Sequence, residues 1–268
     1  MATDPTAVPH LVSERSSRVR PGLRQPGPPT IGTWVKLPTL ETLELLAHAG
    51  FEFVVVDMEH SALGLESVYR LVFGAQALGM AALVRVADRS GNLYQRVLDA
   101  GADGILVPQV SSAEEARTAI EGMTFAPDGR RGMGLTARAG RWGIEGVVGY
   151  LATGQDIVRC VQIEDLETLR HADRILDVDG LDAVFVGMGD LTMSSRLPAD
   201  HPEIRGATDR LLELARERGV PCGTAVGDAA GVAAGASRGF SFIMVSNDAS
   251  MFARAALELG AASRAALG

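Results

Sequence analysis

The sequence predicts an α/β protein built as one (β/α)8 barrel, and three observations support that fold. The chain has 268 residues, 47% of them hydrophobic, which suffices for one large core because such barrels use roughly 250 residues. Short runs rich in β-branched residues alternate with stretches of helical spacing, as parallel strands joined by helices do. An open doubly wound sheet would carry a glycine fingerprint after its first strand, but no second glycine closely follows Gly32.

Eight apolar runs are the expected strands, and they occur at regular intervals from residue 31 onward. Residues 1–30 are rich in proline and arginine and are expected to form a flexible extension, so the barrel domain spans residues 31–268. The strands are expected at residues 31–35, 53–56, 82–86, 104–107, 158–163, 183–186, 222–226 and 240–245. Helical crossovers are expected at residues 40–49, 65–78 and 112–122, and a last helix at residues 251–267.

Charge and cysteine content exclude several classes of protein. Lys and Arg number 25 against 33 Asp and Glu, giving a net charge of −8, which disfavours binding to nucleic acid or an anionic membrane surface. No stretch reaches the roughly 18 apolar residues of a membrane helix. The cysteines, Cys160 and Cys222, lack metal-ligand spacing and cannot form a disulfide framework. We therefore expect a cytoplasmic protein that acts on small molecules.

Two carboxylates follow expected strands at the end of the barrel where active sites form. Glu164 follows the fifth run and Asp190 the sixth. Two hard oxygen ligands leave most of an octahedral shell for water and substrate, an arrangement that suits Mg²⁺, Mn²⁺ or Co²⁺. The structural alternative is that Glu164 pairs with an arginine and Asp190 caps the next helix. Their shared position at strand ends favours the metal site.

Three further polar residues lie at strand ends. His60 follows the second strand and could transfer protons near neutral pH, or it could be a surface histidine. Arg85, on the third strand, could bind a carboxylate or pair with an acid of the barrel. Lys36 is the only lysine of the chain and could form a Schiff base with a keto acid. A Schiff-base mechanism would make no use of the metal-binding carboxylates Glu164 and Asp190. We therefore favour the alternative that Lys36 is a charged residue near the barrel mouth without a covalent role.

Seven ordered motifs resemble the HpcH/HpaI family of metal-dependent pyruvate aldolases over about residues 31–260. More distant members of that group are macrophomate synthase and the citrate lyase beta chain. The motifs are Asp57-Met58-Glu59-His60, Arg85-Val86, residues 98–108, Gly129-Arg130-Arg131-Gly132, Ala137-Arg138-Ala139, Gln162-Ile163-Glu164 and Gly187-Met188-Gly189-Asp190-Leu191.

The resemblance implies a phosphoenolpyruvate/pyruvate-type TIM barrel and a class II aldolase mechanism, acting on a 2-oxo acid and an aldehyde. Glu164 and Asp190 would hold the divalent ion, which stabilises the enolate as the carbon-carbon bond breaks. The predicted substrate contacts are Gln162, Arg85, Gly187, Gly189 and Trp34. His60, paired with Asp99, would move the proton of the aldol hydroxyl, with Asp57 in support. The family also implies a homohexamer, a dimer of trimers that exchange the last helix.

Some positions depart from the family pattern and leave the reaction open. Met188 and Gly189 stand where many relatives have a proline and another residue, and Ser194, Ser195 and Arg196 replace a glycine-containing ending. These positions line the aldehyde side, so the sequence does not define the acceptor. Alternatives are decarboxylation of the macrophomate synthase type, cleavage of a CoA thioester, and a barrel that binds ligands without catalysis.

Overall fold

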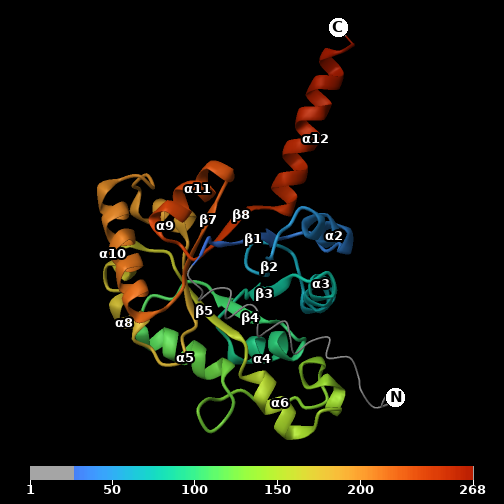
Figure 1. The fold of residues 1–268 in the computed structure, drawn as a ribbon, viewed down its shortest axis with the longest axis vertical. Helices are drawn as coiled ribbons and strands as arrows, with labels where there is room; N and C mark the ends of the chain where they lie inside the picture. The colour runs from blue at the N-terminus through green and yellow to red at the C-terminus, as the bar shows by residue number, and fades with distance from the viewer. Residues whose placement is uncertain (1–26, 268) are drawn as a thin grey trace.

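The computed structural model describes residues 27–267, which form a closed barrel of eight parallel strands in the order β1 to β8 (Figure 1). Each strand pairs with the next in the sequence, and β8 pairs with β1 to close the ring. The predicted (β/α)8 fold is therefore confirmed. Residues 1–26, most of the predicted extension, lie outside the described residues.

The strands lie close to the positions expected from the sequence. Four match their predicted bounds, and the others differ by one or two residues. The largest shift is at β8, where the backbone N–H of Phe240 donates to the Gly235 carbonyl and so completes the end of the preceding helix. The strands are β1 Thr30–Val35, β2 Phe53–Asp57, β3 Ala81–Arg85, β4 Gly104–Val107, β5 Val158–Ile163, β6 Ala183–Val186, β7 Cys222–Val226 and β8 Phe242–Asn247.

Helices connect the strands around the outside of the barrel (Figure 1). The predicted crossovers at residues 40–49, 65–78 and 112–122 correspond to α2, α3 and α5. The helices are α2 Leu40–His48, α3 Leu65–Ala77, α4 Gly91–Asp99, α5 Ala113–Met123, the 3-10 helix η1 Arg138–Gly143, α6 Gly146–Gly154, α7 Leu166–Arg170, α8 Asp173–Leu176, α9 Met188–Ser195, α10 Pro202–Arg218, α11 Ala229–Arg238 and α12 Asp248–Ala265. None of the helices in residues 27–267 has the length and apolar character needed to cross a membrane.

Aromatic rings fill the inside of the barrel. The Phe185 ring lies 5.9 Å from the ring of Trp34 and 6.2 Å from that of Phe242. Two glycines make room for the rings: a Cβ on Gly32 would lie 2.4 Å from Phe53, and one on Gly223 would lie 2.1 Å from Phe242. The second core layer, rich in Val, Leu and Ile, packs between strands and helices. The barrel interior is thus filled with packed side chains, which form the floor of the site at the carboxyl ends of the strands.

The last helix, α12, projects away from the barrel (Figure 1). It is predicted at residues 251–267 and begins three residues earlier, at Asp248, after Asn247 caps it through a hydrogen bond to the Ser250 backbone N–H. Asp248 is the only residue of α12 that is buried in the described chain. Most apolar side chains of α12 are therefore not packed against the barrel of the same chain.

We expect Phe185→Ala to lower the free energy of unfolding by about 3–5 kcal/mol, because it leaves a cavity among rings that cannot close over it. Urea denaturation followed by circular dichroism measures the loss. The matched change Leu45→Ala, at a leucine that is 71% exposed on α2, should cost less than about 1 kcal/mol. Equal losses for the two variants would contradict a packed barrel floor.

Candidate active site

Side chains from the carboxyl ends of the strands converge on one face of the barrel. Lys36 directly follows β1, Asp57 ends β2, Arg85 ends β3 and Glu164 directly follows β5. Asp190 lies in the first turn of α9, just after β6. The sequence predicted that all five would lie at the barrel mouth, and the parallel barrel places their strand ends on the same face.

The centre of this face is an ion pair between Asp57 and Arg85. Nε and Nη2 of Arg85 donate to the two carboxylate oxygens of Asp57, each at 2.8 Å, and Asp57 is fully buried. Burial raises the pKa of this carboxyl, but hydrogen bonds and charge from Arg85 and Lys36 outweigh burial and lower the pKa to about 2. Asp57 is thus a permanent anion that holds its neighbours in place, which fits its predicted supporting part better than proton transfer.

Two residues with no role predicted from the sequence join this network. Glu59 lies 3.1 Å from Nη1 of Arg85, so all three guanidinium nitrogens of Arg85 face carboxylates. Gln109, just beyond β4, donates its side-chain N–H to Glu59 at 2.9 Å. Its backbone has a left-handed φ of 56°, which turns the chain sharply at the mouth. Gln109 follows the fourth strand, and this position at a strand end could have identified it from the sequence as a residue of the site.

Glu164 lies deep in the mouth with Gln162, its neighbour on β5. The side-chain N–H of Gln162 donates to Glu164, while Oε1 of Gln162 is buried and finds no hydrogen-bond partner among residues 27–267. Burial raises the pKa of Glu164, and the charges of Glu59 and Asp190 raise it further, against hydrogen bonds from Gln162 and the Gln109 backbone. Among the ion pairs formed within residues 27–267, none involves Glu164, and its nearest charged neighbours that shift its pKa are the carboxylates of Glu59 and Asp190.

Glycine at position 187 keeps this part of the mouth open. A Cβ on Gly187 would lie 2.8 Å from Nε2 of Gln162 and 3.1 Å from a carboxylate oxygen of Glu164. At Gly189, the second residue of α9, a Cβ would meet nothing within 4 Å. Both glycines border the face that carries Glu164 and Asp190, and their contact with substrate remains a prediction.

Trp34 lies under the mouth as part of its floor. The ring is 8% exposed, and the guanidinium carbon of Arg85 sits 4.1 Å above its centroid, a cation–π contact. Trp34 therefore supports Arg85 from below. Its predicted contact with substrate is not tested by this geometry.

His60 and Asp99 lie at opposite ends of the barrel. The His60 side chain is 54% exposed beside the mouth, with Nε2 3.8 Å from an oxygen of Glu59. Asp99 ends α4, which runs back from the mouth; it pairs with Arg131 at 3.5 Å and accepts from the Tyr150 hydroxyl at 3.3 Å. Burial raises the pKa of Asp99, although Arg131 opposes this. The predicted His60–Asp99 pair is therefore not made within one chain.

The residues of the mouth suit a divalent cation. The charged side chains named above comprise two cations, Lys36 and Arg85, and four carboxylates, of Asp57, Glu59, Glu164 and Asp190. Carboxylates therefore outnumber cations among these six side chains. Within residues 27–267 no three His, Cys, Asp or Glu side chains are grouped to hold a metal by themselves. Glu164 and Asp190 as ligands that share an ion with other oxygens remain a prediction.

Asp57→Asn should lower the free energy of unfolding by about 2 kcal/mol at neutral pH, the value of lowering the pKa from 3.8 to about 2 on folding. Because a lowered pKa stabilises only the ionised form, the difference from wild type should be full above about pH 4 and shrink as the pH falls toward 2. Urea titrations between pH 3 and 7 measure it. A difference that is independent of pH would show that the Asp57 charge does not stabilise the fold.

Comparison with known proteins agrees with the fold. The HpcH/HpaI aldolase/citrate lyase family matches residues 30–255. The 2-dehydro-3,6-dideoxy-6-sulfogluconate aldolase of Pseudomonas putida is 34% identical over 240 residues, covering 88% of this chain and 92% of that protein. The 4-hydroxy-2-oxo-heptane-1,7-dioate aldolase of Escherichia coli is 33% identical over 239 residues, covering 88% of this chain and 90% of that protein.

Solved structures show the same likeness. An HpcH/HpaI aldolase/citrate lyase family protein from Burkholderia cenocepacia superposes with a TM-score of 0.85 at 30% identity, covering 92% of this chain and 98% of that one. Macrophomate synthase shares the fold, with a TM-score of 0.80 at 23% identity over 94% of this chain and 91% of that one. On its sequence and its fold, the chain belongs to the HpcH/HpaI aldolase/citrate lyase family.

Proposed function

We propose that this protein is a class II aldolase that uses Mg²⁺, Mn²⁺ or Co²⁺ to make or break a carbon-carbon bond between the enolate of pyruvate, or of a related 2-oxo acid, and an aldehyde. The observation that carries this proposal is the excess negative charge around Glu164, whose pKa is raised by burial and by the carboxylates of Glu59 and Asp190. A divalent cation would relieve that repulsion. The aldolase relatives, at 33–34% identity, support the same chemistry.

Glu164 and Asp190 would hold the metal, which supplies a Lewis acid that stabilises negative charge on the 2-oxo acid. Arg85 supplies fixed positive charge at the same face, because Asp57 and Glu59 hold its guanidinium in one orientation above Trp34. The unpartnered Oε1 of Gln162 is a buried acceptor beside Glu164 and would orient the bound acid or a water molecule.

His60 would transfer the proton of the aldol hydroxyl. Its ring is exposed at the rim, within reach of a substrate that enters the mouth. The backbone N–H groups of Glu59 and His60 donate to Oδ1 of Asp57 at 3.1 and 3.3 Å. This fixes the turn that carries the imidazole.

The residues expected to line the aldehyde side of the mouth do not indicate which aldehyde is the acceptor. Met188 is half-buried, Gly189 is exposed, and Ser194 and Ser195 turn their hydroxyls back onto backbone carbonyls of their own helix. Decarboxylation of oxaloacetate and cleavage of a CoA thioester are alternatives that use the same metal and enolate. Direct assays with oxaloacetate and malyl-CoA separate them from aldol chemistry.

The central test is exchange of the methyl protons of pyruvate with deuterated water, followed by NMR, because it reports enolate formation without any aldehyde. We expect exchange with Mg²⁺, Mn²⁺ or Co²⁺, its loss after EDTA treatment, and its recovery when metal is returned. Glu164→Gln should slow exchange by about 100-fold or more, since it removes one of two charged ligands.

The matched control is Glu167→Gln, which removes an exposed carboxylate on α7 that pairs with His171; it should leave exchange unchanged. Full activity in EDTA would overturn the metal mechanism. A protein that binds pyruvate and metal but exchanges no protons would instead be a barrel that binds without catalysis.

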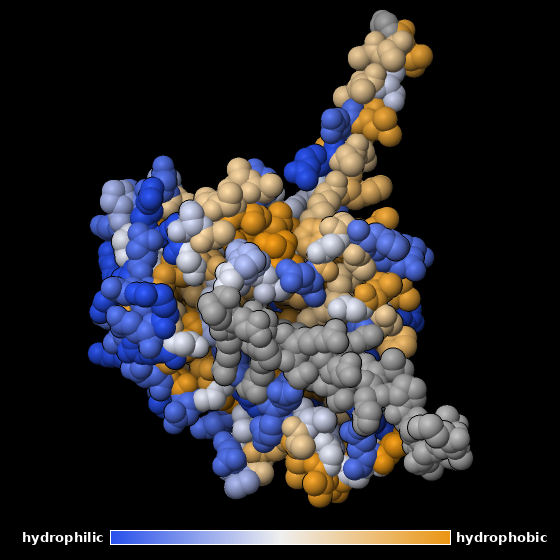
Figure 2. All heavy atoms as spheres, viewed as in Figure 1, coloured by the Kyte–Doolittle hydropathy of each residue, from blue (hydrophilic) through white to orange (hydrophobic). Residues whose placement is uncertain are grey.

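A homo-oligomer, with α12 exchanged between subunits, is part of the same proposal. Large apolar side chains are exposed along α12, where they alternate with polar ones (Figure 2); Phe252, Leu257 and Leu259 are 71%, 70% and 69% exposed. A projecting helix with several exposed large apolar side chains is typical of a surface that other protein covers. A hexamer would provide that cover and could bring Asp99 of one subunit to His60 of another. The buried free thiols of Cys160 and Cys222 support the proposed cytoplasmic location.

Sedimentation velocity should show wild-type protein at the mass of a hexamer. The double change Phe252→Asp and Leu257→Asp should shift most of the protein to smaller species, because it places charge where α12 needs apolar cover. Leu45→Asp, at an equally exposed leucine on α2, is the matched control. Wild-type protein that sediments as a single chain would refute helix exchange.

A further inference from the structure

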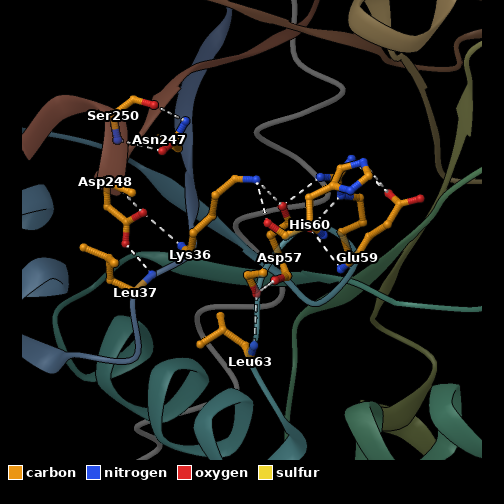
Figure 3. Close-up of polar contacts among 12 residues, drawn as sticks. Lys36, Leu37, Asp57, Glu59, His60, Leu63, Asn247, Asp248 and Ser250 are labelled. Atoms are coloured by element: carbon orange, nitrogen blue, oxygen red, sulfur yellow. Dashed lines mark hydrogen bonds and ion pairs between the residues drawn. The ribbon is translucent and has the colours of Figure 1, made fainter. Parts of the chain in front are cut away.

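Lys36 lies at the centre of the contacts around the mouth (Figure 3). Its Nζ is 2.9 Å from Oδ2 of Asp57 and donates to the backbone carbonyl of His60 at 3.1 Å. All other basic side chains among the 25 Lys and Arg residues are arginines. An ammonium is a compact charge whose donors can reach two oxygens in different directions, whereas a guanidinium is a planar fork. The position therefore uses what only lysine offers.

This contact fixes the turn that carries the imidazole. The turn begins at Asp57 and is closed by the Ser61 hydroxyl, which donates to the Asp57 carbonyl and accepts from the Leu63 N–H. Its other bonds run from the Glu59 and His60 N–H groups to Asp57. Two bonds tie the turn to neighbouring strands: the Met58 N–H donates to the Arg85 carbonyl, and Lys36 donates to the His60 carbonyl. Loss of Lys36 would free that carbonyl and remove one cation from Asp57.

The backbone of Lys36 is held from its other side by the first residue of α12. The N–H groups of Lys36 and Leu37 donate to Oδ1 and Oδ2 of Asp248, at 2.9 and 3.0 Å, and Asp248 is 4% exposed. Figure 3 shows Lys36 between Asp248 on one side and Asp57 and His60 on the other. The start of α12 is thus joined to the turn of His60 through one residue.

We propose that Lys36 is a positioning residue: its ammonium holds the His60 turn against Asp57, and Asp248 holds Lys36 in place, so that the root of α12 supports the site of proton transfer. This inference rests on the proposed function of His60. It also gives Lys36 a role other than the Schiff base considered from the sequence. The Nζ of Lys36 is engaged by the Asp57 carboxylate and the His60 carbonyl, which hold it as a support for the turn and not as a free amine.

The first test compares Lys36→Met, which keeps the aliphatic stem without the charge, with Lys36→Arg and with Arg70→Met. Arg70 pairs with Glu66 on the exposed face of α3 and serves as the matched control. We expect Lys36→Met to lower kcat for aldol cleavage by about 10- to 100-fold, part of what proton transfer contributes, with KM for the 2-oxo acid unchanged within about threefold. Lys36→Arg should recover part of kcat, and Arg70→Met should behave as wild type.

The decisive comparison is with His60→Ala. If Lys36 acts through His60, the double variant Lys36→Met/His60→Ala should be no slower than His60→Ala alone. Effects that multiply would overturn the proposal and assign Lys36 an independent role. Borohydride reduction with pyruvate should leave the mass of the protein unchanged, and a covalent adduct at Lys36 would likewise overturn it.

A readout without turnover separates this inference from the proposed function. NMR signals of the His60 ring, identified by their loss in His60→Ala, should move in Lys36→Met and stay near their wild-type positions in Arg70→Met. If they stay in place in folded Lys36→Met, Lys36 does not position His60, whether or not the protein is an aldolase. Where Lys36→Met fails to fold, Asp248→Asn gives the same test: it should move the same signals, and unmoved signals would again refute the inference.

Discussion

The buried carboxylate of Asp57 is the interaction on which the rest of the mouth depends. It joins the ends of three strands, since it binds Arg85 of β3 through two bonds, Lys36 beyond β1 through a third, and the turn after β2 through backbone N–H groups. A buried charge is tolerated only when every lone pair is matched. Here the matching partners are Arg85 and the turn that carries His60, the groups to which the proposed aldolase mechanism assigns roles.

On the opposite side of the mouth the charges are not matched. Glu164 is buried among other acids, and its pKa is raised by burial and by Glu59 and Asp190. Gln162 adds an acceptor with no partner. One half of the site is thus neutral and rigid, while the other carries negative charge that a cation would offset. This division between a compensated half and an uncompensated half is typical of sites that trade stability for function.

The first residue of α12 connects this site to the part of the chain that has no core of its own. Asp248 is buried and binds the backbone beyond β1, whereas Phe252, Leu257 and Leu259 are exposed. The barrel of one chain is therefore complete as a fold, with a floor of aromatic rings under the mouth, yet it presents a long apolar helix to its surroundings (Figure 2). Asp248, the first residue of this helix, also accepts a hydrogen bond from the backbone N–H of Lys36.

The sequence alone determined the barrel, because eight β-branched runs with short crossovers allow few other arrangements and parallel strands must place Asp57, Arg85 and Glu164 at one end. It could not determine which of these residues bind one another. Glu59 and Gln109 enter the site through a turn after β2 and a left-handed residue after β4, and Trp34 lies under Arg85 instead of facing open space. Asp99 pairs with Arg131 at the far end of α4. Periodicity reports which face of an element is buried, but contacts between side chains depend on the angles at which elements meet, and these are set only when the ring of strands closes.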